Sequence, residues 1–137
     1  MTEPCDLSAV AARLAISERR LSPVELVDSC LQRIDDLNPT LNAIVTVARE
    51  SAQEEARQAE AALARGVADG LLHGLPIAIK DLQDTKGLVT TYGTAFYKNH
   101  LPKQDAGIVA RVRAAGGIVI GKTNIPEMSI GANTINR

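Results

Sequence analysis

Lys80 directly follows the short apolar run Leu75–Ile79, and its amine is a group that can act as a base once it loses its solvation. An exposed lysine has a pKa of about 10.4 and accepts no proton at neutral pH until burial disfavours its ammonium form. The apolar run offers such burial. By pattern alone, the same placement is equally typical of a solvated lysine that closes a strand, so both interpretations stay open at this point.

Residues 116–123, Gly-Gly-Ile-Val-Ile-Gly-Lys-Thr, match the phosphate-loop pattern GxxxxGKT. That loop needs a strand before its first glycine, free backbone N–H groups at the variable positions, and a helix that begins at the Lys-Thr pair. Here a predicted helix precedes the glycines, the variable positions predict a strand, and Pro126 follows closely. We therefore expect no phosphate site, and nucleotide binding is only a third hypothesis for this chain.

The first half of the sequence predicts helices. Asp6 or Ser8 can cap a short helix that runs through Ala15. Ser22-Pro23-Val24-Glu25 forms a capping box with proline at the first helical position, and the helix it begins should end at Asn38-Pro39. Residues 42–47 predict an edge strand, and residues 48–65 a surface helix with a narrow contact face of small residues.

The second half predicts a strand, a helix and another strand. The strand over 75–79 ends at Lys80-Asp81, and residues 84–94 are polar and glycine-bearing, as in a loop. Asp105 should cap a helix over 106–115, and residues 118–120 form the next strand, which Lys122 follows. Such an order implies a right-handed parallel crossover, so the predicted class is α/β, with N-terminal helices packed on part of a mixed sheet.

Three segments in this order and spacing resemble the amidase signature family: residues 74–81 (Gly-Leu-Pro-Ile-Ala-Ile-Lys-Asp), residues 85–94, and residues 121–128 (Gly-Lys-Thr-Asn-Ile-Pro-Glu-Met). The similarity runs from about Leu7 to Arg137. It implies an α/β/α fold on a large mixed sheet, of which this chain would hold part. It also implies hydrolysis of a carboxylic amide by a Ser, cis-Ser, Lys triad, with no metal and no organic cofactor.

In that scheme the resemblance assigns the catalytic base to Lys80 and a structural part to the neighbouring Asp81. The substrate is a small-molecule amide, and Met128, Ser129 and Ile130 are candidates for lining its acyl pocket, although ordinary packing after a strand explains them equally well. Lys122 receives no catalytic role. His73, beside Gly74, is a turn residue rather than a base.

Both serines of the family lie downstream of the last matching segment, so the chain carries one triad member of three. We expect residues 1–137 to be the N-terminal portion of one amidase domain, with a mainly helical layer over 1–70 and a strand-loop-helix-strand segment over 71–137. Such a fragment should not hydrolyse amides alone, because a base without a nucleophile or oxyanion hole cannot stabilise the tetrahedral intermediate. Its unpaired sheet edge could lead to self-association.

Composition narrows the partners. The 15 Lys and Arg against 16 Asp and Glu give a net charge of −1, which argues against a nucleic-acid or anionic-membrane binder. The acidic start lacks the pattern of a signal peptide, which favours a cytoplasmic protein. Cys5 and Cys30 have no metal-ligand spacing and are expected as reduced thiols.

Two further functions remain as alternatives to a stand-alone amidase. One is the glutamine amidase subunit of a transfer RNA amidotransferase, a relative within the same family, although residues 123–127 look more like those of stand-alone amidases. The other is a non-catalytic fragment that binds a partner through a helix or sheet surface.

Overall fold

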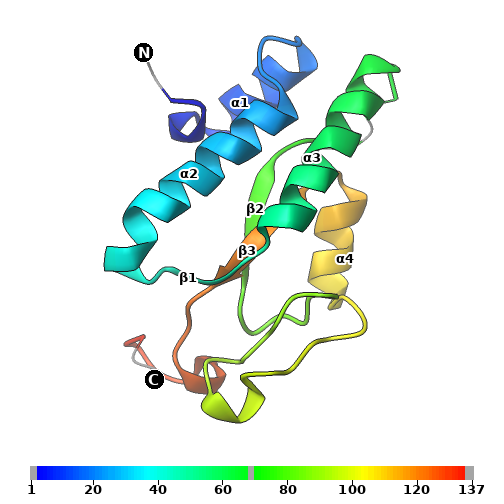
Figure 1. Ribbon diagram of the computed structural model, residues 1–137. Helices are drawn as coiled ribbons and strands as arrows, with labels where there is room; N and C mark the ends of the chain where they lie inside the picture. Colours follow the sequence, from blue (N-terminus) through cyan, green and yellow to red (C-terminus); the bar gives the residue numbers. More distant parts are fainter. Residues whose placement is uncertain (1–2, 68–69, 135–137) are drawn as a thin grey trace.

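A three-stranded mixed sheet with helices on both of its faces forms the framework of the computed structural model, which describes residues 3–67 and 70–134 (Figure 1). The strand order is β1-β3-β2. β3 (Ile118–Thr123) is central; it runs parallel to β2 (Pro76–Lys80) and antiparallel to β1 (Ile44–Val47). The predicted α/β class, with N-terminal helices on a mixed sheet, is confirmed.

The N-terminal segment consists of a 3-10 turn, η1 (Pro4–Asp6), and the helix α1 (Ala9–Ser17). Ser8 is the N-cap of α1, since its Oγ accepts a hydrogen bond from the Ala11 N–H at 3.2 Å. Asp6, the other candidate cap, lies in η1 instead and pairs with Arg33 of the next helix at 2.9 Å. Of the two predicted caps, Ser8 is therefore the correct one.

The second helix, α2 (Pro23–Leu41), begins with the predicted capping box of Ser22 and Glu25 but does not end where the sequence predicts. It continues through Pro39 for another half turn and closes at Asn42, whose φ of 47° is left-handed. Proline removes only its own N–H donor, and the Asn42 N–H still bonds the Asn38 carbonyl at 2.7 Å. The Asn38 side chain bonds both backbone groups of Ile44, each at 2.8 Å, and so joins this end of the helix to β1.

One face of the sheet is covered by α2 and by α3 (Arg49–Ala64). Small residues on α3 let its backbone approach closely: Ala52 and Ala56 are fully buried against Ile118 and Ile120 of β3, beside Leu31 of α2. The predicted narrow contact face of α3 is confirmed.

The other face is covered by α4 (Gly107–Ala114), where Val109 packs against Ile79 and Val119. Ala106, not Asp105, is the N-cap of α4, and it makes no side-chain capping bond. The Asp105 carboxylate instead accepts from the Lys86 N–H at 2.7 Å and pairs with Arg113 at 3.3 Å. The prediction that Asp105 caps this helix is wrong, because these partners engage its carboxylate.

Two strand predictions need correction. β3 extends through Lys122 to Thr123, so Lys122 lies inside the strand rather than after it. β2 was expected to be apolar and buried on both faces, but Ile79 is its one buried residue and Ala78 is exposed. The glycines 116–117 follow α4, and residues 118–123 form β3, so the arrangement of a phosphate loop is not present here.

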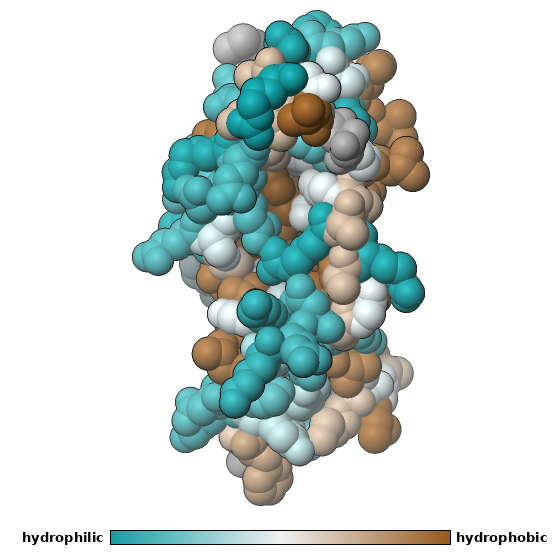
Figure 2. Space-filling model, turned by 90° about the vertical axis from the view of Figure 1, so that its right-hand side faces the viewer, coloured by the Kyte–Doolittle hydropathy of each residue, from teal (hydrophilic) through white to brown (hydrophobic). Residues whose placement is uncertain are grey.

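Hydrophilic side chains cover most of the surface in Figure 2, with hydrophobic ones in small separate areas between them. This view faces the side of the molecule that lies on the right in Figure 1. Among the helices of residues 3–67 and 70–134, none combines the length and the apolar character that crossing a membrane requires.

Candidate functional site

Lys80 is the last residue of β2, as predicted, and stands opposite Thr123 of β3 in the parallel register. The preceding residue, Ile79, pairs with Lys122 and is buried against α4. Because successive side chains of a strand point to opposite faces, Lys80 lies on the face of the sheet opposite to Ile79 and Lys122.

The Lys80 side chain is exposed, which differs from the expectation of a largely buried stem beside a cleft. The physical reason is the alternation along β2: Ala78 and Lys80 share one face, and both are exposed in the described part of the chain. Apolar neighbours in the sequence thus buried Ile79 without burying Lys80. Its assignment as the base stays a prediction.

Asp81, directly after Lys80, is 1% exposed and organises the loop of residues 81–94, which we call the β2 loop. Its carboxylate accepts a hydrogen bond from the Thr91 hydroxyl at 2.5 Å and from the Thr91 N–H at 3.1 Å. Its backbone N–H bonds the Thr123 carbonyl at 3.1 Å, and its carbonyl accepts from the Tyr92 N–H at 3.1 Å. These bonds give Asp81 a structural part.

Lys122 is the largest fully buried side chain of the described residues, at 0% exposure. Its Nζ donates to the Thr85 and Thr90 hydroxyls, both at 2.9 Å, and to the Gln83 carbonyl. The Asp81 carboxylate lies 4.0 Å away. Burial lowers the pKa of Lys122 to about 8, partly offset by the negative charge of Asp81.

The candidate substrate segment Met128, Ser129 and Ile130 follows β3 in and just after the 3-10 turn η3 (Glu127–Ser129). Met128 and Ser129 have φ values of 51° and 59°, in the left-handed region that non-glycine residues seldom adopt. Met128 is 43% and Ile130 is 81% exposed, and Ser129 is half-buried. All three side chains are thus available for contact, and their role in lining an acyl pocket stays a prediction.

Backbone hydrogen bonds connect this segment to the β2 loop. The Met128 N–H donates to the Tyr92 carbonyl at 2.7 Å, and Tyr92 itself has a left-handed φ of 52°. Next to it, a side chain at Gly93 would bring its Cβ within 2.8 Å of the carbonyl oxygens of Ile125 and Pro126. The β2 loop and the chain before η3 therefore pack with no room between them.

A second polar cluster lies on the outer side of the β2 loop. The Tyr92 hydroxyl donates to Asp84 at 2.5 Å and lies 3.1 Å from His100 Nε2, while Tyr97 packs edge-on against the Tyr92 ring at 5.0 Å between centroids. Burial and the Asp84 carboxylate raise the pKa of Tyr92 to about 12. A pocket of about 300 Å³ adjoins this cluster, with Asp84 and Asp105 in its lining.

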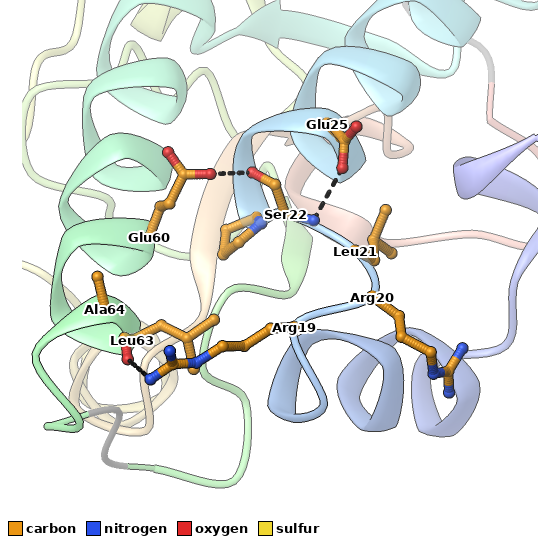
Figure 3. A pocket seen from close by; sticks show the side chains of 9 residues that line it. Arg19, Arg20, Leu21, Ser22, Glu25, Glu60, Leu63 and Ala64 are labelled. Atoms are coloured by element: carbon orange, nitrogen blue, oxygen red, sulfur yellow. Dashed lines mark hydrogen bonds between the residues drawn. The ribbon is translucent and has the colours of Figure 1, made fainter.

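A pocket of about 260 Å³ lies where the turn between α1 and α2 meets the end of α3 (Figure 3). Its polar groups bond one another: Ser22 donates to Glu60 at 2.5 Å, Glu25 accepts from the Ser22 N–H at 2.9 Å, and Arg19 donates to the Leu63 carbonyl at 3.2 Å. These contacts close helix ends, and the pocket contains none of the sequence-predicted site residues. In the part of the chain that the structure describes, no group of three or more His, Cys, Asp or Glu residues is placed to hold a metal ion.

Sequence reasoning missed the cluster of Lys122, Thr85 and Thr90. A lysine directly after Ile118-Val119-Ile120-Gly121 was a usable signal, since a strand that continued through it would bury it beside a central position of the sheet. The two threonines carried no comparable signal, because their approach to Lys122 depends on the path of the β2 loop.

Comparison with known proteins identifies the family to which this fold and these segments belong. The family model described as Amidase matches residues 25–137. The chain therefore belongs to the amidase signature family, as its motifs indicate.

Two curated relatives illustrate the range of the family. The chain is 42% identical over 121 residues to the amidase-family subunit of a glutamyl-tRNA(Gln) amidotransferase of Azoarcus sp. (strain BH72), an alignment that covers 88% of this chain and 25% of that protein. It is 38% identical over 130 residues to an acylamidase of Rhodococcus erythropolis, covering 95% of this chain and 27% of that protein. The chain thus spans about a quarter of the length of the curated relatives it matches.

Solved structures give the same fold. A crystal structure of an amidase superposes with a TM-score of 0.83 at 34% identity, over 91% of this chain and 28% of that one. A bacterial aryl acylamidase of the amidase signature family gives 0.81 at 27% identity, over 89% of this chain and 26% of that one. A fatty acid amide hydrolase gives 0.92 over 100% of this chain and 25% of that one, but at 20% identity this likeness concerns the fold alone.

Proposed function

We propose that the gene product that contains this chain hydrolyses carboxylic amides, with Lys80 as the base of a Ser, cis-Ser, Lys triad. The observation that carries the proposal is the combination of family membership with the position of Lys80, which ends β2 within the matching segment 74–81. Asp81 supports this role because its buried hydrogen bonds fix the backbone on which Lys80 stands.

In the proposed reaction the neutral Lys80 amine accepts a proton from the cis-serine hydroxyl, which in turn accepts one from the nucleophilic serine as that serine attacks the amide carbonyl. The tetrahedral intermediate expels the amine, which receives the proton, and water then hydrolyses the acyl-enzyme. An exposed lysine is protonated at neutral pH, so the proposal requires that the working enzyme desolvates Lys80. The two serines are supplied outside residues 1–137.

The test is Lys80→Ala in the full-length gene product, with ammonia release from simple aliphatic and aromatic amides as the measurement. Removal of the base should abolish measurable turnover with little change in thermal midpoint, because the exposed Lys80 side chain contributes little to packing. Lys103→Ala, at another exposed lysine, is the matched control and should keep wild-type turnover. Wild-type turnover in Lys80→Ala would remove this residue from the mechanism.

A second candidate function is the amidase component of a glutamyl-tRNA amidotransferase. It is favoured by the identity of 42% to the Azoarcus protein, and by further relatives of the same name at 36% to 40%. The substrate distinguishes the two candidates. Ammonia release from glutamine, but not from simple aliphatic or aromatic amides, would favour the amidotransferase component, and the reverse preference would favour a stand-alone amidase.

A further inference from the structure

The buried Lys122 joins β3 to both arms of the β2 loop. Its Nζ contacts Gln83 and Thr85 on the arm that leaves β2, and Thr90 on the arm that returns. Lysine is almost never fully buried unless its charge is paired. The chain therefore keeps a charge at this position against the cost of burial, and neither the family triad nor a phosphate loop accounts for it.

The hydrogen-bond donors and acceptors of this cluster require a charged Lys122. The Thr85 hydroxyl donates its proton to the Gln83 carbonyl at 3.0 Å, and the Thr90 hydroxyl donates to the Leu88 carbonyl at 3.3 Å. Both hydroxyls can then only accept from Lys122, as can the Gln83 carbonyl. Nζ must donate three hydrogen bonds, and only an ammonium group has three protons to donate.

The β2 loop that Lys122 holds has a predicted site residue at each end. It begins directly after Lys80, and at its far end the Tyr92 carbonyl receives the Met128 N–H. Between these ends, the Tyr92 N–H bonds the Asp81 carbonyl at 3.1 Å, so the two ends of the loop are tied to each other. A shift of the loop would therefore change the direction of Lys80 and the position of Met128 together.

We propose that Lys122 is a positioning residue for amide hydrolysis: its ammonium group anchors the β2 loop and thereby sets the geometry between Lys80 and the segment that begins at Met128. The inference rests on the proposed function, since Lys80 and Met128 matter to catalysis only if the protein is an amidase. Lys122 does not itself exchange protons with substrate, because all three of its protons are donated inside the cluster and its side chain is closed to solvent.

The experiment compares Thr90→Val with Thr90→Ser in the full-length gene product. Valine keeps the volume of threonine but removes an acceptor of the Lys122 ammonium, whereas serine keeps that hydroxyl. We expect kcat to fall by about tenfold to a hundredfold in Thr90→Val, the range for a small misplacement of reacting groups, and to stay within about threefold of wild type in Thr90→Ser. The acid limb of the kcat/KM profile, which reports the pKa of the base, should move in Thr90→Val alone.

Trypsin cleavage provides a measurement that does not depend on activity. Lys86 is exposed in the β2 loop, so a loosened loop should be cut after Lys86 several times faster in Thr90→Val than in wild type or Thr90→Ser. Leu31→Ala is the control for general destabilisation, because Leu31 is buried on the other face of the sheet. It should lower the thermal midpoint without moving the acid limb and without selective cleavage after Lys86.

Wild-type kinetics and wild-type cleavage in Thr90→Val would overturn the inference. So would a loss of activity with an unmoved pH profile and no selective cleavage, as in Leu31→Ala. Failure of the proposed function has a different signature: a wild-type protein that hydrolyses no amide, or a Lys80→Ala variant with full turnover. Either result ends the catalytic role of Lys122, while selective cleavage of Thr90→Val would still establish the anchor.

Discussion

On the face of the sheet that packs against α2 and α3, Ile118 and Ile120 join an apolar cluster with Leu31 and the alanines of α3. On the opposite face, the apolar packing of Ile79 and Val119 gives way toward the end of β3 to Lys122 and its hydroxyl and carbonyl acceptors. The first face can exchange one aliphatic group for a smaller one at moderate cost, because dispersion contacts are individually weak. The second cannot, because each polar group there depends on a particular partner.

The largest expected effect that tests this contrast is that of Lys122→Met, compared with Ile118→Val on the apolar face. Methionine keeps the length of the side chain but leaves the Gln83 carbonyl and the Asp81 carboxylate without the ammonium, so we expect a loss of about 3 to 5 kcal/mol in the free energy of unfolding. Ile118→Val removes one buried methyl group and should cost about 0.5 to 1.5 kcal/mol. Urea unfolding of the full-length gene product measures both. Equal costs for the two variants would show that the polar face is no more demanding than the apolar one.

A pH dependence that only the polar face can produce comes next. The pKa of Lys122 is lowered from 10.5 to about 8, so between these values the unfolded chain binds more protons than the folded one. Stability therefore rises with pH through this window and is lost again as pH falls toward 8. The wild-type protein should gain on the order of 3 kcal/mol over Lys122→Met between pH 8 and pH 10.5. A difference that stays constant across the window would mean that the three acceptors and Asp81 offset the cost of burial.

How far the sequence could predict the molecule follows the same contrast. The capping box at Ser22, the small-residue face of α3 and the strand that ends at Lys80 depend on neighbours close in the chain, and local patterns therefore predicted them. The path of α2 beyond Pro39 depends on bonds that the Asn38 side chain makes to Ile44, which lies outside the helix. The true cap of α4 was missed because the Asp105 carboxylate is engaged by Lys86 and Arg113, and no local rule contains both.

For the candidate site, family motifs found Lys80 and the segment at Met128, but not the side on which Lys80 faces. Its exposure follows from the alternation along a strand whose neighbour Ile79 takes the buried position. The Lys122 cluster was out of reach for another reason. It requires Thr85 and Thr90 to be brought within 2.9 Å of a residue more than thirty positions away in the chain, and only the folded path of the β2 loop does so.

The smallest effect concerns Tyr92, at the outer edge of the same polar face. Its pKa is raised from 10.0 to about 12 by burial and by the Asp84 carboxylate. The folded state thus holds the proton that the unfolded chain has lost, so the contribution of Tyr92 to stability is fully present below pH 10 and disappears as pH rises through 12. A titration of tyrosinate absorbance should show a late-ionising tyrosine that is absent in Tyr92→Phe. Asp84→Asn should bring this ionisation to lower pH while leaving the Lys122 cluster intact, because Asp84 bonds the Tyr92 hydroxyl and makes no hydrogen bond to Nζ. An unchanged titration in Asp84→Asn would assign the shift to burial alone and make the outer edge of this face as indifferent to its partners as the apolar face.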